Sequence, residues 1–246
     1  MAWAAVIPAA GLRTLLPSCD FKCLVRWSLG IPPVTGEGPL PSCPRCAGPL
    51  DGSGHHLVCC HRNGITRRHG AVQDFVLSLA HKAGFVARRE QGGDDRTRPG
   101  DVLITRLDAN GPCAVDITVR HTLPPSHPLR TPGDLPAWVA RQESEKRSKY
   151  ESACRSLGWS FTPFVLDCYG ALGREGRGLM STLLKMLLAQ RETWERRGAE
   201  ADAWQGLSLS LMREIGSQLR AARYLQFHDP GDEDPPVSHD PYPSSR

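Results

Sequence analysis

The fold is decided by two short apolar runs, Asp101-Val-Leu-Ile-Thr105 and Cys113-Ala-Val-Asp-Ile-Thr-Val119. Both runs are rich in β-branched residues, which favour an extended backbone. The turn signal Asn110-Gly111-Pro112 separates them, so the sequence predicts two strands that form a hairpin or lie side by side.

Further elements with recognisable periodicity flank these two strands. Apolar residues keep helical spacing over 69–83, and residues 138–157 predict a long helix rich in Glu, Lys, Arg and Ala. Another buried strand is predicted over 161–166, where Pro163 favours a sheet edge. The remaining predictions are a helix over 21–29, a strand over 85–90, a Pro-rich loop over 123–136, a Gly-rich loop over 170–178, and helices over about 179–197 and 204–226. Strands interleaved with helices indicate a compact α/β domain over about 62–226.

The composition is that of an ordinary globular protein. Of the 246 residues, 40% are hydrophobic and 23% are charged, which excludes a mainly disordered chain. No run approaches the roughly 18–20 apolar residues that span a bilayer, so we expect a soluble protein without membrane contact. Pro8 interrupts the apolar start and no positive charge precedes it, so we also expect no secretory signal.

Charge is distributed unevenly along the chain, which carries +4 overall. Residues 229–246 contain five acids, one Arg and five prolines, and we expect them to form a disordered acidic tail. The rest of the chain therefore carries about +8, and residues 60–98 hold eight Lys or Arg against four acids. A basic body favours nucleic acid as the partner.

A cysteine-rich segment precedes the predicted α/β domain. Four of the nine cysteines lie between positions 43 and 60, interleaved with histidines, which indicates a metal in a reducing, intracellular compartment. The knuckle Cys43-Pro-Arg-Cys46 with His56 and Cys60 forms the most economical ligand set, a closed structural zinc site. The alternatives are free buried thiols, or ligands drawn from His55, Cys59 and His61.

Asp101 and Asp116 are the candidate catalytic carboxylates. Strand alternation gives one face to Ala114, Asp116, Thr118 and Arg120, and the apolar face to Val115, Ile117 and Val119. A carboxylate in so apolar a strand needs compensation, and Mg²⁺ would hold two such groups in the charged state. The alternatives are that Asp101 closes a turn and that Asp116 pairs with Arg120 or with a helix dipole.

The helix predicted over 138–157 supplies the candidate lysines. Its inward stripe is expected to consist of Val139, Lys146, Tyr150, Ala153 and Leu157, with Lys149 at the edge. A lysine turned toward the core needs an acidic partner, and Lys146 would then position or polarise an attacking water or a phosphate. The alternative is that Lys146 pairs with Glu143 or Gln142 on a solvated face.

The order and spacing of these motifs resemble a known family. The chain carries, in order, Arg67-Arg-His-Gly70, Arg98-Pro-Gly-Asp101, Asp116-Ile-Thr-Val-Arg120 and Lys146-x2-Lys149-Tyr150. With the preceding Cys/Cys/His/Cys module, this order is similar to the restriction-like endonuclease domain at the C-terminus of site-specific non-LTR retrotransposon polyproteins, within the PD-(D/E)xK superfamily. Leu24-Val-Arg-Trp-Ser-Leu-Gly30 is similar to related reverse-transcriptase-associated sequences, so the resemblance covers about residues 21–226.

Three positions depart from the family pattern. Gly100 splits the expected Pro-Asp pair, and Gly70 replaces the Asp or Asn that follows the histidine. Thr118 stands where the superfamily usually has a lysine, so the resemblance implies a lysine supplied from the following helix.

The resemblance implies a restriction-endonuclease-like mixed sheet flanked by helices, and the activity of a Mg²⁺-dependent DNA endonuclease. Asp101, Asp116 and the Ile117 carbonyl would hold the Mg²⁺. Lys146 or Lys149 would assist the attacking water. Glu90, at the end of the preceding predicted strand, is a further candidate carboxylate near the metal, and the alternative is a surface residue beside Arg88 and Arg89. Arg67, Arg68, His69 and Tyr150 are the candidate nucleic-acid contacts.

Four segments are expected along the chain. They are a helical lead-in over 1–40, a Cys/Cys/His/Cys zinc knuckle over 41–61, the nuclease-like domain over 62–226 and the acidic Pro-rich tail over 227–246. The resemblance implies a nuclear protein and a parent polypeptide with a reverse transcriptase, which these 246 residues do not contain. Two other functions fit the same residues: a catalytically inactive, zinc-containing nucleic-acid-binding module, and a zinc-organised protein-interaction domain.

Overall fold

The computed structural model describes residues 15–33, 42–89, 100–108, 111–121 and 134–223. Among the sequence predictions, the acidic tail, Glu90 and the first part of the helical lead-in lie outside these residues. The same holds for Arg98 and Pro99, which precede Asp101 in the motif quoted above.

The described chain contains every helix and strand predicted from its sequence. The strands are β1 (Val86–Arg89), β2 (Val102–Asp108), β3 (Gly111–Arg120) and β4 (Ser160–Asp167). The helices are α1 (Ser18–Ser28), α2 (His55–Cys59), α3 (Ile65–Lys82), α4 (Asp134–Ser156), α5 (Arg174–Ala189) and α6 (Arg196–Arg223). The short helix α2 is an addition inside the predicted zinc knuckle, and the mixed α/β class is confirmed. Among the described helices, none combines the length and the apolar character that crossing a bilayer requires.

All five helices predicted from the sequence begin earlier than expected, and α5 ends at Ala189 rather than near 197. The early starts of α4 and α5 have a clear physical reason. α4 starts at Asp134 although the sequence indicates a Pro-rich loop there, because a proline in the first turn of a helix needs no backbone N–H partner. α5 starts at Arg174 and includes two glycines that indicate a loop in the sequence. Gly176 is buried, and a Cβ atom there would meet Leu172 and Phe164, so close packing on β4 accounts for this glycine.

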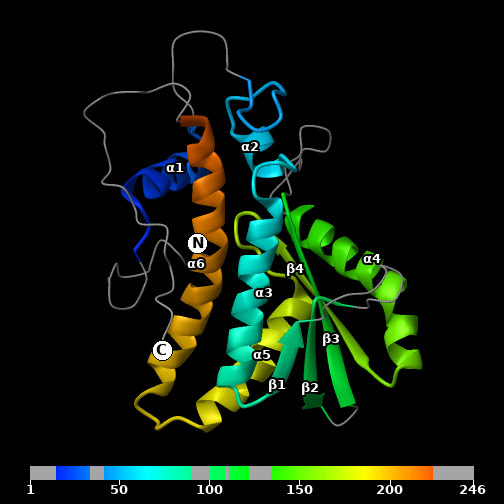
Figure 1. Cartoon of the computed structure of the whole chain (residues 1–246). Coiled ribbons are helices and arrows are strands. Elements are labelled where there is room, and N and C mark those ends of the chain that lie inside the picture. The colour runs from blue at the N-terminus through cyan, green and yellow to red at the C-terminus, as the bar shows by residue number, and fades with distance from the viewer. Residues whose placement is uncertain (1–14, 34–41, 90–99, 109–110, 122–133, 224–246) are drawn as a thin grey trace, which may run out of the picture.

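The four strands form one mixed sheet in the order β1-β2-β3-β4 (Figure 1). β2 pairs antiparallel with both β1 and β3, and β3 pairs parallel with β4. The predicted hairpin is therefore β2 and β3, and Pro163 lies on an edge strand, as its missing N–H requires. In the register of β3 and β4, Asp116 lies opposite Pro163.

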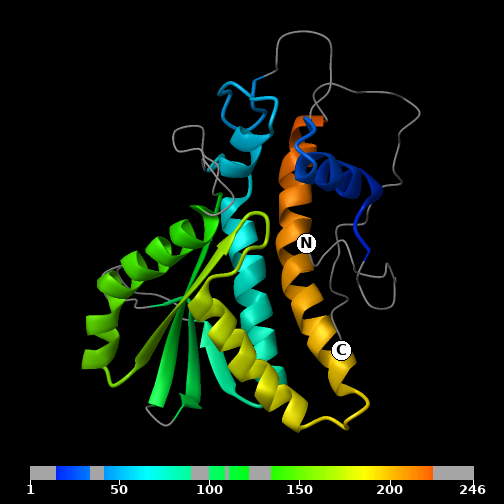
Figure 2. The ribbon, with the colours of Figure 1, turned by 180° about the vertical axis from the view of Figure 1, so that it is seen from behind.

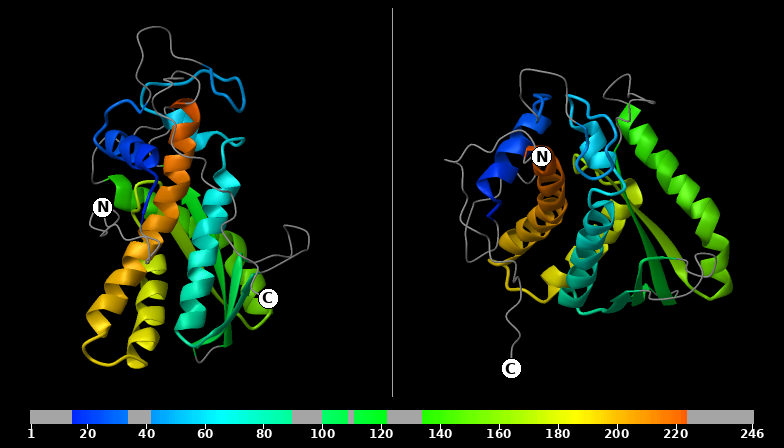
Figure 3. Two further views of the ribbon diagram at one scale, coloured as in Figure 1. Left: turned by 60° about the vertical axis from the view of Figure 1, so that its left-hand side comes forward. Right: turned by 45° about the horizontal axis from the view of Figure 1, so that its top comes forward.

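Helices cover both faces of the sheet (Figures 1 and 2). α4 covers one face, α3 and α5 cover the other, and α6 packs on the outer side of α3 (Figure 3). The predicted alternation along β3 is confirmed, because Val115, Ile117 and Val119 belong to the main core. Ala114 belongs to a smaller apolar cluster beneath α4, whose other buried members are Leu103, Cys154 and Phe161.

The cysteine-rich segment shares the main core. The buried side chains that it contributes are Cys43, Leu50, Leu57, Val58 and Cys60, and they belong to the same apolar cluster as side chains of α3, α5 and α6. α1 and α2 both pack against α6, which brings the segment to one end of that helix (Figure 1). A metal held by this segment would therefore act on the stability of the common core.

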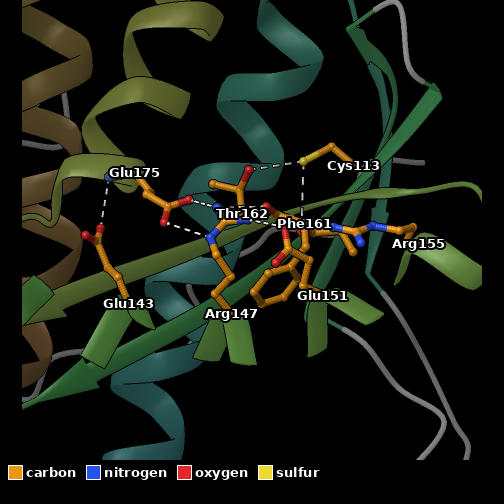
Figure 4. Close-up of polar contacts among 9 residues, drawn as sticks. Cys113, Glu143, Arg147, Glu151, Arg155, Phe161, Thr162 and Glu175 are labelled. Atoms are coloured by element: carbon orange, nitrogen blue, oxygen red, sulfur yellow. Dashed lines mark hydrogen bonds and ion pairs between the residues drawn. The ribbon is translucent and has the colours of Figure 1, made fainter. Parts of the chain in front are cut away.

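α4 is anchored to β4 and α5 by charged side chains (Figure 4). Arg147 donates to both carboxylate oxygens of Glu175, to Glu151 and to the Phe161 carbonyl. Glu143 accepts the backbone N–H of Glu175 at 2.9 Å, near the start of α5. These contacts set the rotation of α4 about its own axis.

The predicted inward stripe of α4 is partly wrong. Lys146 and Tyr150 are half-buried, but Ala153 is exposed and Leu157 is 52% exposed. The buried side chains of the helix are Val139, Gln142, Glu143 and Cys154. Because Glu143 and Arg147 hydrogen-bond to α5 and β4, the side of α4 that carries them faces the sheet.

Candidate functional site

Four side chains of the cysteine-rich segment converge on one point. The potential ligand atoms of Cys43, Cys46, His56 and Cys60 all lie within 4.8 Å of one another. Cys46 Sγ lies 3.1 Å from His56 Nε2, and Cys43 Sγ lies 3.9 Å from Cys60 Sγ. Three thiols and one imidazole suit a tetrahedral structural site, so the group could hold a metal such as zinc. These are the four residues predicted from the sequence, and His55, Cys59 and His61 are not among them.

Local backbone contacts hold these ligands in place. The knuckle is closed by hydrogen bonds from Cys43 N to Gly48 O at 2.7 Å and from Ala47 N to Cys43 O at 2.8 Å. The Asp51 carboxylate accepts the His56 N–H at 2.6 Å and so caps the short helix that carries this histidine. The ligands therefore come from a closed turn and a capped helix, which reduces the ordering that metal binding requires.

The thiols of the group differ in acidity. The hydrogen bond from the Gly48 N–H lowers the pKa of Cys46 to about 7, so this thiol readily becomes the thiolate that a metal needs. Burial raises the pKa of Cys60 to about 11. A bound cation would favour the thiolate of Cys60 as well, because its charge opposes the effect of burial.

A second polar cluster lies where β2 begins, beside the middle of β3. The backbone N–H of Asp101 donates to Val115 O at 2.8 Å, and the Asp101 carboxylate accepts the Ile117 N–H at 2.7 Å. His69 Nε2, on α3, lies 3.2 Å from the same carboxylate oxygen and 3.0 Å from Ile117 O. Since both oxygens can only accept, Nε2 carries the proton and donates to them.

Gly100 explains how Asp101 reaches Ile117. A Cβ atom at position 100 would lie 3.0 Å from Val115 O and 3.2 Å from the Val115 N and C atoms. These are backbone atoms of a central strand, so they cannot move aside as the end of a flexible side chain would. The glycine that splits the Pro-Asp pair is therefore required by the close approach of two backbones.

We expect Gly100→Ala to lower the free energy of unfolding by about 1–3 kcal/mol, because the methyl group would overpack against Val115. Gly70→Ala in α3 is the matched control, since nothing lies within 4 Å of its added methyl group. The control is expected to gain about 0.5–1 kcal/mol, because alanine favours a helix. Urea unfolding measures both changes, and wild-type stability of Gly100→Ala would contradict the close approach.

Asp116 faces α4. Its carboxylate lies 2.9 Å from Lys146 Nζ and accepts the Thr118 hydroxyl at 3.3 Å. Lys146 thus has the acidic partner that an inward lysine needs. Asp116 pairs with Lys146 rather than with Arg120, whose guanidinium donates to Gln142 at 2.8 Å.

The two carboxylates differ in how their charge is compensated. Burial alone would raise the pKa of Asp101, but the hydrogen bond and the charge of His69 lower it below its usual value. The same hydrogen bond raises the pKa of His69. Burial raises the pKa of Asp116 despite Lys146, and the nearby charge of Asp101 adds to this rise. Asp101 is therefore held as an anion, and Asp116 would ionise more readily beside an added cation.

Three further residues of the predicted site lie on α3 and α4. Lys149 is exposed, and its Nζ lies 4.7 Å from the centre of the Tyr150 ring. Tyr150 is half-buried, and its ring centre also lies 5.5 Å from Lys146 Nζ. Arg67 is exposed and forms an ion pair with Glu214 of α6 at 3.3 Å. Contacts of Lys149, Tyr150 and Arg67 with nucleic acid or water stay predictions.

Arg68 lies in the interior, which corrects its predicted contact with nucleic acid. It is 2% exposed, and its NH1 donates to Val58 O at 3.0 Å and to Gln218 Oε1 at 3.1 Å. Its NH2 lies 3.5 Å from Val119 O. An enclosed guanidinium cannot reach a phosphate, so Arg68 instead links the cysteine-rich segment, α6 and β3.

Sequence reasoning missed the role of two glutamines near the candidate site: Gln73 was not considered, and Gln142 was considered only as a partner of Lys146, whereas it accepts from Arg120. Gln73 Nε2 donates to the Asp101 carbonyl at 2.7 Å, from one helical turn after His69 on α3. Gln142 is buried one helical turn before Lys146 on α4. The signal that could have found them is the spacing of four residues, which puts each glutamine on the same helix face as a predicted site residue.

Comparison with known protein families and curated proteins finds no match to the chain. Over the described ranges, the Cys43, Cys46, His56 and Cys60 group is the one set of three or more His, Cys, Asp or Glu side chains close enough together to hold a metal. The resemblance to restriction-like endonucleases therefore rests on the sequence motifs alone.

Proposed function

We propose that the chain is a metal-dependent DNA endonuclease of the restriction-like type found in non-LTR retrotransposon polyproteins, with a structural zinc site. One observation carries the proposal: two carboxylates, each with a cationic partner, lie at neighbouring positions along the middle of β3. Asp101 faces His69 from the α3 side, and Asp116 faces Lys146 from the α4 side. Acids and cations gathered in this way suit the binding and hydrolysis of a phosphodiester.

The donor atoms of this cluster fit Mg²⁺. Asp101, Asp116 and the Ile117 carbonyl offer oxygen only, which is the ligand type that Mg²⁺ prefers. The cysteine-rich group offers sulfur and nitrogen instead, which suit zinc. When bound, Mg²⁺ supplies a water of lowered pKa and stabilises charge on a phosphate.

Lys146 and His69 would act from opposite sides of the cluster. The Lys146 ammonium has three donors, and it would orient the attacking water or neutralise a phosphate oxygen beside Asp116. His69 would hold Asp101 and the Ile117 carbonyl in place through its Nε2–H. Thr118, which stands where the superfamily usually has a lysine, would orient Asp116 through its hydroxyl.

Cleavage of supercoiled plasmid by the full chain tests this function, with zinc content measured on the same preparation. Nicking that requires added Mg²⁺ supports the endonuclease. Salt-sensitive DNA binding without cleavage in any divalent cation would favour the inactive nucleic-acid-binding module instead. If the chain neither cleaves nor binds DNA, and instead binds a protein in a way that survives high salt, the protein-interaction domain would be favoured.

Substitutions of the two candidate lysines should lower the nicking rate by different amounts in the same assay. Lys146→Met is expected to lower the nicking rate by about 100-fold or more, because Lys146 contacts the Asp116 carboxylate. Lys149→Met changes an exposed side chain and should cost about threefold or less. Nicking at saturating DNA, with thermal unfolding as a check of folding, compares the two variants. Equal losses would contradict the assignment of the ion-paired lysine.

A further inference from the structure

Arg120 ends β3 on the face that carries Asp116 and Thr118. The Arg120 side chain is exposed, and its NH1 donates to Oε1 of Gln142, which is only 9% exposed. Gln142 Nε2 in turn donates to Glu145 Oε2 at 2.9 Å. Because arginine can only donate and a carboxylate can only accept, these two contacts fix the orientation of the buried amide.

This arrangement holds a cation at the surface in a defined position. An unrestrained arginine carries about 2 kcal/mol of rotamer entropy, so a buried partner that fixes its guanidinium prepares it for a ligand. The Gln142 contact occupies one of the five N–H donors of Arg120. Gln142 is a neutral partner, so within the described part of the chain the charge of Arg120 is not cancelled by an ion pair.

The position of Arg120 relates it to the carboxylate cluster. Two contacts between β3 and α4 follow one another: Asp116 with Lys146, and Arg120 with Gln142 one helical turn away. Arg120 lies four positions after Asp116 along the strand, a rise of about 13 Å. Phosphates of one DNA strand recur about every 3.4 Å along the helix axis, so a strand engaged at Asp116 that follows the direction of β3 would bring another phosphate near Arg120.

We propose that Arg120, oriented by Gln142, binds a backbone phosphate of the DNA a few nucleotides from the cleaved bond. The proposal rests on the proposed endonuclease function and concerns how the DNA is held rather than how it is cut. A planar guanidinium fits this ligand because it can donate two parallel hydrogen bonds to one phosphate. Such a contact positions the strand and is the same for every base sequence.

Binding of the full chain to a fluorescein-labelled DNA duplex, measured by anisotropy without Mg²⁺ at several salt concentrations, tests the contact. Arg120→Ala is expected to weaken binding about tenfold and to reduce the slope of log K against log salt by about 0.9. Arg141→Ala is the matched control, an exposed arginine beside Gln142 on α4, and should keep its affinity within about twofold with an unchanged slope. In the nicking assay, Arg120→Ala should raise KM and leave kcat unchanged.

Gln142→Ala separates orientation from charge. It should weaken binding by about three- to tenfold with the salt slope unchanged, because the guanidinium is released but not removed. Arg120→Gln replaces Arg120→Ala if the alanine variant does not fold, since it keeps a donor for Gln142. If a folded Arg120 variant keeps the wild-type DNA affinity and the wild-type slope of log K against log salt, the phosphate contact is overturned and the proposed endonuclease function is not affected. A wild-type chain that neither binds nor nicks DNA would instead refute the proposed endonuclease.

Discussion

Asp116→Asn is expected to lower the rate of Mg²⁺-dependent nicking by at least about 100-fold. Asparagine has the same shape and can still accept a hydrogen bond from Lys146, but it lacks the charge that a bound cation needs. Because burial already raises the pKa of Asp116, a neutral amide at this position adds no desolvation cost. The variant should therefore stay folded, and its loss of activity would report on the charge.

Asp74→Asn is the matched control for this experiment. Asp74 also forms an ion pair, but it is exposed on α3 and its partner is Arg89 of β1. This control is expected to nick DNA at the wild-type rate. Nicking rate, melting temperature and zinc content are compared for the three proteins, and full nicking by Asp116→Asn would rule out the assigned site.

The sheet could be predicted because the sequence of β3 alternates between apolar and more polar residues, which identifies its two faces. Val115, Ile117 and Val119 alternate with more polar residues, so the period of two identifies a strand and its buried side without any distant information. Pro163 likewise marks an edge strand by its own chemistry. Such local signals were sufficient for the layers of the fold.

The parts that could not be predicted depend on contacts distant in sequence. Nothing near Gly100 indicates that its backbone lies against Val115, and that approach brings Asp101 to Ile117. Arg67 and Arg68 are neighbours in one motif, and only the phase of α3 against α6 and β3 decides that Arg68 is enclosed. The burial of α4 side chains depends in the same way on its anchor to α5.

The candidate metal ligands were predictable in part from local spacing and in part only from the structure. His56 and Cys60 stand four residues apart, and their spacing to the knuckle predicts the set, but His55 and Cys59 have nearly the same spacing. The phase of α2 resolves the choice, because the His55 ring packs against the His121 ring with their centres 4.1 Å apart. The adjacent His56 then turns to the cysteines.

Cys60→Ser is expected to release the metal and to destabilise the whole described fold. A metal whose free concentration is about 1,000 times its Kd stabilises the folded state by about 4 kcal/mol. Its loss should lower the melting temperature by about 8–16 °C for a chain of this size. The transition should shift as one unit, because Cys43, Leu57 and Cys60 share the apolar core of α3 and α6.

Cys59→Ser supplies the control that makes the Cys60 result specific. Cys59 is the neighbouring thiol, half-buried and outside the group of four, so its variant should keep one zinc per chain and a melting temperature within a few degrees of the wild type. Zinc content by mass spectrometry and thermal unfolding measure both variants, and a chelator added to the wild type should reproduce the Cys60→Ser shift. The two substitutions exchange the same atoms one residue apart. Zinc lost from Cys59→Ser and kept by Cys60→Ser would therefore reverse the ligand assignment. Two independent unfolding steps would show that the metal stabilises the cysteine-rich segment alone.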